Sequence, residues 1–138
     1  MKIAICCSIT SAKEAMDIKY KLEKMGHEVT VPHNIHLYAD GTLKPETREQ
    51  STQNKRKDDL IRDYYEQIKE HDALLAINLE KYGIKNYVGG NTFLEIGFAH
   101  VLNKKIFLLN PVPDMLYADE ILAMDPVVIN GDISLISL

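Results

Sequence analysis

The chain has 138 residues, of which 46% are hydrophobic and 26% are charged, fractions close to those of ordinary globular domains. No stretch approaches the roughly 18 uninterrupted apolar residues that a membrane span requires, so we expect a single soluble domain without a membrane partner. The formal net charge is −4 and no basic stripe is present, which argues against a surface for duplex nucleic acid.

The first predicted strand is Ile3–Cys7. The segment before it carries one positive charge and no small-residue cleavage site follows, so we expect a strand rather than a signal peptide, and a cytoplasmic location. Cys6 and Cys7 are adjacent, and because neighbouring strand side chains point to opposite faces we expect two free thiols. Both are interpreted as small buried hydrophobic residues, since no histidine partner for a nucleophilic cysteine can be placed.

Hydroxyl side chains follow this strand at Ser8, Thr10 and Ser11, just before a helical pattern that Gly26 ends at a favourable C-cap position. These hydroxyls are candidates to bind a sugar hydroxyl or a phosphate. Ser11 and Glu14 also have the spacing of a capping box, in which the hydroxyl and the carboxylate each bond a backbone N–H group. Helix capping explains the hydroxyls equally well.

A second strand is predicted at Glu28–Val31, and the polar residues 33–53 are predicted to form a long loop. Loops of that length in a compact domain are usually functional or mobile. His33 and His36 lie in this segment beside Tyr38 and could stack on a base, although loop histidines are usually just solvated. They lack a convincing third ligand, so we expect neither a metal nor another cofactor.

The second half of the chain alternates between helical and strand patterns. The predicted elements are a helix at 54–71, a buried strand at Ala73–Ile77, a helix from Gly89-Gly90 to about Asn103, a buried strand at Lys105–Leu109, a short helix at 119–123 and a fifth strand at Val127–Ile129.

Five strands alternating with helices predict a three-layer α/β sandwich of the Rossmann-like or flavodoxin-like type, with a mainly parallel five-stranded sheet. In such sheets ligands bind beyond the carboxyl ends of the strands, where the strand order reverses. The polar and glycine residues that we predict to bind substrate at this edge are Ser8, Thr10, Ser11, Asn78, Gly89, Gly90, Asn91, Thr92 and Asn110.

The pair Gly89-Gly90 opens a predicted helix. Glycine permits positive φ and a close backbone approach, and a helix N-terminus presents unpaired N–H groups, so this turn is suited to an anion. It matches neither the dinucleotide fingerprint nor a P-loop, because no Gly-Lys-Ser/Thr follows.

Glu95 shares its helix face with Phe98, Ala99 and Leu102, which predicts a buried carboxyl group. Burying a carboxylate costs several kcal/mol unless it is paired or hydrogen-bonded, so this residue needs a reason to be there. The spacing Thr92-x-x-Glu95 offers a structural reason, a capping box in which Glu95 bonds the Thr92 N–H. Spacing alone favours that structural interpretation.

The segment from Gly89 to Ala99, with the sequence GGNTFLEIGFA, is followed by NKKIFLL at 103–109. Together they resemble the glycine-rich turn, helix and strand of the nucleoside 2-deoxyribosyltransferase superfamily, which includes deoxynucleoside monophosphate N-hydrolases. The element order also matches, so the resemblance implies one such domain over 1–138 and a homo-oligomer. It further implies that Glu95 is the nucleophile at the anomeric carbon, which raises this role above the capping role.

Relatives in this family usually carry an aspartate eight positions ahead of the aspartate that opens the third strand. Asp72 opens that strand here, which puts Tyr64 at the expected place and Asp63 one residue earlier. The resemblance makes Asp63 the candidate second catalytic carboxylate. A displacement of one residue turns a side chain by about 100° around a helix, so its aim depends on how the helix is set.

We therefore expect an enzyme that cleaves or transfers the N-glycosidic bond of a nucleoside or nucleoside 5′-monophosphate, a reaction whose oxocarbenium-like state a carboxylate stabilises or captures. The alternative is a non-catalytic nucleotide-binding or sensor domain, which the offset between Asp63 and Tyr64 favours. A third alternative is a phosphoribohydrolase acting on a modified nucleotide, suggested by the order G-G-x-T-x-x-E. The lack of an arginine soon after the turn argues against it.

Overall fold

A five-stranded sheet with the strand order β2-β1-β3-β4-β5 forms the centre of the computed structural model, which describes residues 1–45, 47–57 and 59–137. All four strand pairs are parallel, which confirms the predicted α/β fold class. The strands are β1 (Lys2–Cys7), β2 (Glu28–Thr30), β3 (Ala73–Ile77), β4 (Lys105–Leu108) and β5 (Val127–Val128).

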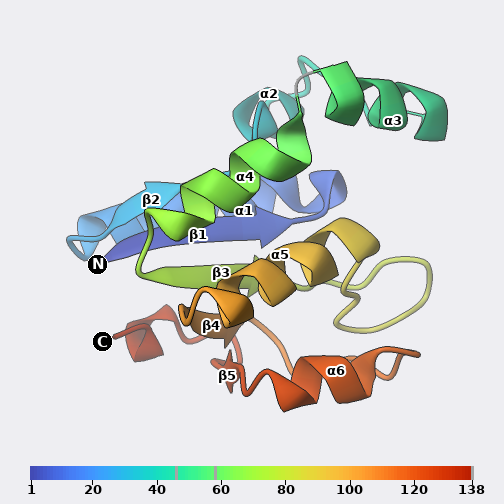
Figure 1. Ribbon diagram of the computed structural model, residues 1–138. Coiled ribbons are helices and arrows are strands. Elements are labelled where there is room, and N and C mark those ends of the chain that lie inside the picture. The colour runs from blue at the N-terminus through green and yellow to red at the C-terminus, as the bar shows by residue number, and fades with distance from the viewer. Residues whose placement is uncertain (46, 58, 138) are drawn as a thin grey trace.

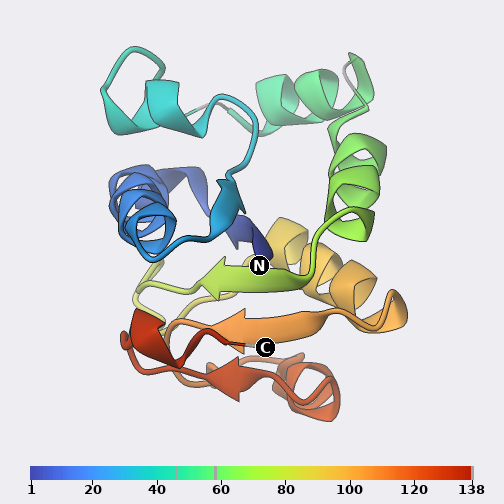
Figure 2. The same cartoon turned by 90° about the vertical axis from the view of Figure 1, so that its left-hand side faces the viewer.

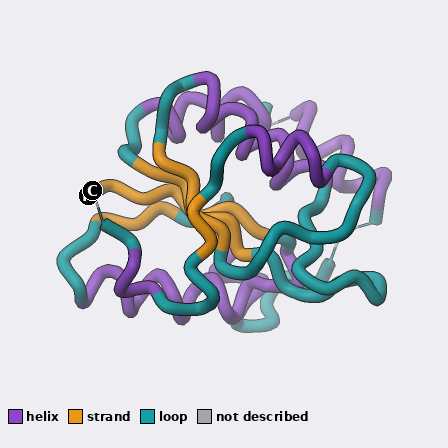
Figure 3. Tube along the Cα trace, turned by 90° about the horizontal axis from the view of Figure 1, so that it is seen from below, coloured by secondary structure: helices purple, strands orange, loops and turns teal. Residues whose placement is uncertain are grey.

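Helices cover both faces of this sheet and complete three layers. Helix α1 lies against one face and α4 and α5 lie against the other (Figure 2). Seen from below, the strands run between two layers of helix (Figure 3). The helices are α1 (Ala12–Lys24), α2 (Ile35–Ala39), α3 (Arg48–Lys57), α4 (Leu60–Lys69), α5 (Gly90–Val101) and α6 (Ala118–Ala123), with short 3₁₀ turns η1 (Ile9–Ser11) and η2 (Ile133–Leu135). No helix in the described ranges has the length and apolar content needed to cross a membrane.

The central strands are buried on both faces, so alternate side chains of one strand enter different cores. In β1, Ile3 and Ile5 pack on the α1 side, whereas Ala4 and Cys6 pack with α4 and α5. The prediction of two free cysteines is confirmed, with Cys6 fully buried and Cys7 partly exposed on the opposite face. Cys6 is therefore delivered to the same side of the sheet as α5.

The predicted loop at 33–53 is wrong in part, because it contains α2 and the start of α3. The side chain of Thr47 accepts from the backbone N–H of Gln50 at 3.2 Å, and the Gln50 side chain accepts from the Thr47 N–H at 3.0 Å. This reciprocal capping box starts α3. Helix α3 is polar on every side and has almost no apolar residues, so hydrophobic periodicity could not reveal it.

The single helix predicted at 54–71 is also wrong, since α3 ends at Lys57 and α4 begins at Leu60. Asp59 precedes α4 with a φ of 46°, a left-handed conformation that cannot continue a right-handed helix. The apolar spacing that suggested one helix comes from α4, which buries Tyr64 and Ile68.

The strand order reverses between β1 and β3, whose register pairs Cys7 with Ile77. The loops that follow these two strands therefore meet at the carboxyl edge, where sheets of this kind bind ligands.

Both ends of the described chain lie at the opposite edge (Figure 1). Glu28 donates its backbone N–H to the Met1 carbonyl, and Lys105 donates to the Ser137 carbonyl at 3.0 Å, which places both ends beside strand starts.

Candidate functional site

The Glu95 side chain is buried, with only 7% of its surface exposed, and it lies in the second turn of α5. The side-chain amide of Asn91 donates to its Oε1 over 2.7 Å. The capping box predicted from Thr92 does not form, because the helix begins at Gly90 and Thr92 is already inside it. The carboxyl group thus faces the interior at the carboxyl edge of the sheet instead of closing its own helix.

A thiol and a phenol from two other elements surround this carboxyl group. The Cys6 thiol on β1 is hydrogen-bonded to Glu95. The Tyr64 hydroxyl on α4 donates to the Ile5 carbonyl, and the Glu95 charge contributes to raising the pKa of this phenol. Burial is the main cause of the raised pKa values of both Cys6 and Tyr64, so both groups stay protonated and act as donors.

Burial raises the pKa of Glu95 to about 8, because the charged form has lost most of its hydration. Three features oppose this effect and favour the carboxylate: the hydrogen bond from Asn91, the hydrogen bond from Cys6 and the positive charge of Lys55 on α3. In the free protein at neutral pH the carboxyl group is thus mainly protonated and close to its titration point. A perturbed pKa of this kind, set by burial and specific neighbours, is typical of functional sites.

Asn78 and Asn110 form a clamp between the ends of β3 and β4. The Asn78 side chain donates to the carbonyl of Asn110 at 3.0 Å and accepts from the Asn110 backbone N–H at 2.9 Å, while the Asn110 amide donates to the Asn78 carbonyl at 3.0 Å. Asn78 is fully buried. These contacts join the ends of β3 and β4. Both residues therefore have a structural role that accounts for them without the predicted binding of substrate.

Three polar side chains meet between the loops that follow β1 and β3. Lys81 donates from Nζ to Ser8 Oγ over 2.6 Å, and Ser8 Oγ lies 3.1 Å from Thr10 Oγ1. Ser11 is buried and its backbone N–H donates to the Ser8 carbonyl, but it makes no side-chain cap, so its predicted capping box with Glu14 does not form. The hydroxyls of Ser8 and Thr10 therefore bond each other and Lys81 instead of capping a helix.

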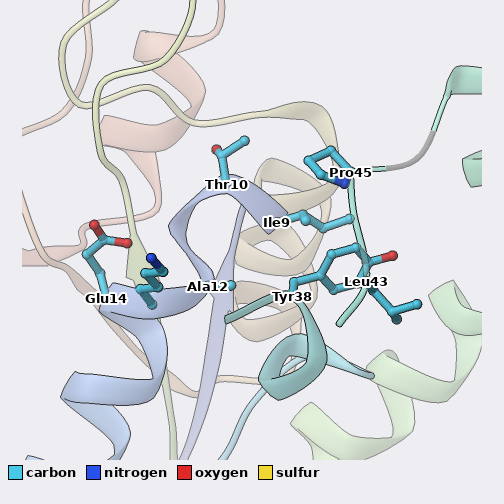
Figure 4. A pocket seen from close by; sticks show the side chains of 8 residues that line it. Ile9, Thr10, Ala12, Glu14, Tyr38, Leu43 and Pro45 are labelled. Atoms are coloured by element: carbon cyan, nitrogen blue, oxygen red, sulfur yellow. The ribbon is translucent and has the colours of Figure 1, made fainter. Parts of the chain in front are cut away.

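A cavity of about 300 Å³ opens beside the loop that follows β1 (Figure 4). Tyr38, Leu43 and Pro45 stand opposite Ile9 in this view, and Glu14 lines another part of the wall. The predicted stacking role of His33 and His36 gains no support, since both are exposed and neither lines the cavity. Tyr38 alone of the three predicted side chains stands at the wall.

A second cavity, of about 530 Å³, lies at the opposite edge of the sheet. Lys105 and Val127, at the starts of β4 and β5, are among its lining residues. It is larger, and Glu95 lines neither cavity, but ligands of such sheets bind at the other edge.

Asp63 and Tyr64 point in different directions from α4. Asp63 is exposed and accepts a hydrogen bond from the Gln67 side chain at 3.2 Å, whereas Tyr64 is buried and faces the core that contains Glu95 and Cys6. The one-residue offset seen in the sequence thus places Asp63 on the exposed face of α4 and Tyr64 on the buried face. The structure does not bring the predicted second carboxylate, Asp63, into contact with Glu95.

The two glycines of the turn have ordinary backbone conformations. Gly89 caps α5 with a φ of −74°, and neither it nor Gly90 has a positive φ, so the turn does not use the left-handed conformation that glycine permits. A side chain at Gly89 would come within 3.3 Å of the Tyr87 ring, whereas nothing lies within 4 Å of a Cβ at Gly90. Gly90 leaves the start of the helix bare, which keeps its N–H groups open to an approaching ligand.

Sequence reasoning missed Lys81, Lys55 and Glu14 as site residues. Lys81 lies in the polar connection after β3, Lys55 in the part of α3 that falls within the helix predicted at 54–71, and Glu14 was assigned to a cap. The only available signal was the position of Lys81 and Glu14 in segments that follow carboxyl ends of strands. Within the described part of the chain, no group of three or more acidic, cysteine or histidine side chains has the arrangement of a metal site.

No protein-family model matches the chain, and no curated protein matches it either. Among solved structures, the fold is similar to that of the Clostridium botulinum CMP N-glycosidase BcmB, with a TM-score of 0.51 and 22% sequence identity. The match covers 93% of this chain and 85% of that one. The similarity confirms the three-layer fold and, at the level of fold, the resemblance predicted from the Gly89–Ala99 segment.

Proposed function

We propose that this protein cleaves the N-glycosidic bond of a nucleoside or nucleoside 5′-monophosphate, with Glu95 acting at the anomeric carbon. The observation that carries the proposal is a buried carboxyl group held by Asn91 and Cys6 at the ligand-binding edge of a fold shared with a CMP N-glycosidase. A buried acid with no structural cap to form is costly, and a catalytic role accounts for its presence.

The chemistry proceeds in two displacements. An ionised Glu95 oxygen bonds the anomeric carbon as the bond to the base nitrogen breaks, and the electron pair of that bond leaves with the base, which takes up a proton. Water then attacks the same carbon, loses a proton, and releases the sugar with the carboxylate restored. An acceptor sugar or base in place of water gives transfer instead of hydrolysis.

Only the ionised form of Glu95 is a nucleophile, and its raised pKa of about 8 limits that form at neutral pH. The donors Asn91 and Cys6 and the positive charge of Lys55 favour ionisation. The developing positive charge on the sugar favours it further as the reaction proceeds. Activity is therefore expected to rise as the pH approaches 8.

Glu14 is proposed as the second carboxylate, in the role of the acid that helps the base leave. It lines the cavity beside the β1 loop, and its charge and that of Glu95 both raise the pKa of the Cys7 thiol, after the larger effect of burial. Their shared electrostatic effect on Cys7 supports a pair of carboxylates at this edge of the sheet, and glycosyl hydrolysis uses such a pair. The other candidate, Asp63, bonds Gln67 on its own helix and contributes to none of the shifted pKa values of Cys6, Cys7 and Glu95, which argues against that role.

The direct test is release of free base from nucleosides and their 5′-monophosphates, followed by chromatography. Glu95→Gln should abolish release, while Glu80→Gln, at an exposed glutamate of the loop after β3, should retain it. Retained activity in Glu95→Gln would exclude Glu95 as the nucleophile.

A non-catalytic nucleotide-binding or sensor domain is the second candidate, because Asp63 faces away from Glu95. It predicts no base release from any substrate together with a rise in melting temperature on adding a nucleoside 5′-monophosphate. Release of free base therefore distinguishes the enzyme from the non-catalytic binding domain.

A homo-oligomer is proposed from apolar side chains that remain on the outer surface of α4 and α5. Ile61, Leu94 and Val101 are 41%, 40% and 69% exposed, respectively. These residues lie on two helices that contact each other, and a contiguous apolar surface across them would be typical of a protein interface. Analytical ultracentrifugation of the wild type and of Val101→Glu tests this, and a wild-type monomer at micromolar concentration would rule it out.

A further inference from the structure

The larger cavity, of about 530 Å³, takes no part in the proposed function. It lies at the amino edge of the sheet, between the end of α5, the starts of β4 and β5 and the residues around η2. Its volume is within the range of about 300 to 1,000 Å³ that is typical of small-molecule sites in proteins. The cavity is therefore large enough to hold a ligand of its own.

Positively charged side chains predominate in the polar part of this cavity. Its lining includes His100, Lys104 and Lys105, together with one acid, Asp125. No ion pair among the described residues involves any of these four side chains. The excess of basic groups contrasts with the net charge of −4 of the whole chain. A local field of this sign favours a negatively charged ligand.

The end of α5 fixes the backbone of Lys104 at the cavity wall. Lys104 donates its backbone N–H to the Ala99 carbonyl at 2.8 Å, and Asn103 donates to the His100 carbonyl at 3.0 Å. Asn103 has a φ of 57°, so the two bonds form a Schellman motif that ends the helix. The Lys104 side chain is partly buried, and a charge in such a place is costly without a partner. An anionic ligand would supply that partner.

Lys105 adds a second ammonium group on the next strand. Its Nζ donates to the backbone carbonyl of Ser137 at 3.0 Å, which is a neutral acceptor. An ammonium group has three N–H donors, so this bond leaves donors for a further acceptor. Lys104 and Lys105 thus bring two positive charges from consecutive residues to one cavity.

Apolar side chains form another part of the wall. Val127 and Leu135 are 50% and 51% exposed, although both are large hydrophobic residues. Met124 also lines the cavity and packs partly buried against the core, and its flexible thioether adapts to ligands of different shape. A ligand with a hydrophobic body would remove this exposed apolar surface from water.

We propose that the cavity at the amino edge is a second ligand site, which binds a small organic anion with a hydrophobic body. Lys104 and Lys105 hold its anionic group, and Met124, Val127 and Leu135 contact its body. The inference is independent of the proposed function, because Glu95 does not line this cavity and the carboxyl edge stays free for the substrate.

Fluorescence titration with two related probes tests the site. Anilinonaphthalene sulfonate is an aromatic anion, and phenylnaphthylamine has the same body without the sulfonate. Lys104→Met should weaken binding of the anion by about 3- to 10-fold and that of the neutral probe by less than about twofold, and Lys104→Arg should keep most of the affinity. Lys85→Met, at an exposed lysine in the loop between β3 and α5, is the matched control and should behave as wild type.

Asp125→Asn provides a test of opposite sign. Asp125 has a φ of 52°, a left-handed conformation that asparagine also adopts, so the substitution removes the charge and keeps the backbone. Binding of the anionic probe should tighten by about 2- to 5-fold, because a like charge is removed, and binding of the neutral probe should not change.

Amide chemical shifts recorded during the same titrations locate the bound probe. They should change most at 103–107 and 124–127. Changes confined to the loops at the carboxyl edge, equal affinities of Lys104→Met and Lys85→Met for the anion, or equal losses for both probes would overturn the inference. Base release plays no part in these measurements, so their failure leaves the proposed function unaffected.

Discussion

The side-chain amide of Asn91 donates to Oε1 of Glu95 over 2.7 Å, one helical turn away on α5. The same helix thus supplies both the carboxyl group and a donor that favours its charged form. Asn91 itself is exposed at the helix start, so this bond links the buried acid to the protein surface.

Asn91→Ala should raise the pKa of Glu95 above its present value of about 8, because a hydrogen bond to the charged form is lost. We expect kcat/KM at pH 7 to fall by about 3- to 10-fold, since the ionised fraction of Glu95 at that pH falls as its pKa rises. A pH–rate profile checks this. Activity should recover toward wild type at pH 9, and a loss that is equal at every pH would contradict it.

Glu95→Gln should stabilise the fold at alkaline pH. The pKa of Glu95 is about 8 in the folded protein and 4.5 in the reference state, so below pH 4.5 both states are protonated and the full contribution to stability is present. Stability is lost as the pH rises from 4.5 through 8, by at most about 5 kcal/mol. Urea unfolding of the wild type and of Glu95→Gln at pH 5 and pH 8.5 measures the free energy of unfolding. The glutamine variant should lack the loss of stability that Glu95 causes between these pH values. A variant less stable than the wild type at pH 8.5 would contradict this.

Asn78→Ala should destabilise the protein by about 2 to 4 kcal/mol, because buried backbone partners at the ends of β3 and β4 lose their hydrogen bonds. Chemical denaturation gives the free energy of unfolding, and Gln53→Ala, at an exposed amide on α3, serves as control. A change below about 0.5 kcal/mol would mean that the clamp is not structural.

Asp63→Asn should leave both base release and stability within experimental error of wild type, since the carboxylate is exposed and bonds only Gln67 among the described contacts.

The neighbouring variant Tyr64→Phe removes a buried hydroxyl that donates to the Ile5 carbonyl, and it should lower the free energy of unfolding by about 1 to 3 kcal/mol. Thermal melting and the base-release assay check both. A large loss of activity in Asp63→Asn would restore Asp63 as the second carboxylate.

Glu14→Gln should lower kcat/KM by about 10- to 100-fold if Glu14 protonates the departing base, with the loss greatest for bases that leave poorly. Rates for a series of bases of different basicity provide the measurement. The neighbouring variant Lys13→Met controls for changes to the cavity wall, which both residues line. Equal losses across the series would argue for a packing role instead.

The buried strands and the helix that carries Glu95 could be predicted because their signals are local. Ala73–Ile77 is a continuous apolar run, and the face of Glu95 followed from the spacing of Phe98, Ala99 and Leu102. The burial of Glu95 predicted in this way is confirmed. Apolar periodicity works at these places because burial is what shapes both elements.

Helix α3 and the Lys81 contact could not be predicted from periodicity. Helix α3 has no apolar face, although the capping box at Thr47 and Gln50 is visible as a local pattern. The bond from Lys81 to Ser8 depends on two loops brought together by strand order, which no short window of sequence contains. The same holds for Glu14, whose spacing from Ser11 fitted a helix cap that did not form.

Both ends of the described chain lie at the amino edge of the sheet (Figure 1). The loops that follow β1 and β3, which carry Ser8 and Lys81, lie at the carboxyl edge. A purification tag or fusion partner attached at Met1 therefore projects away from the candidate site. The same geometry lets the protein be tethered to a sensor surface by this edge with the opposite face turned to solution. Immobilised protein should thus bind small ligands as well as free protein does, which makes surface-based screening of nucleotides practical.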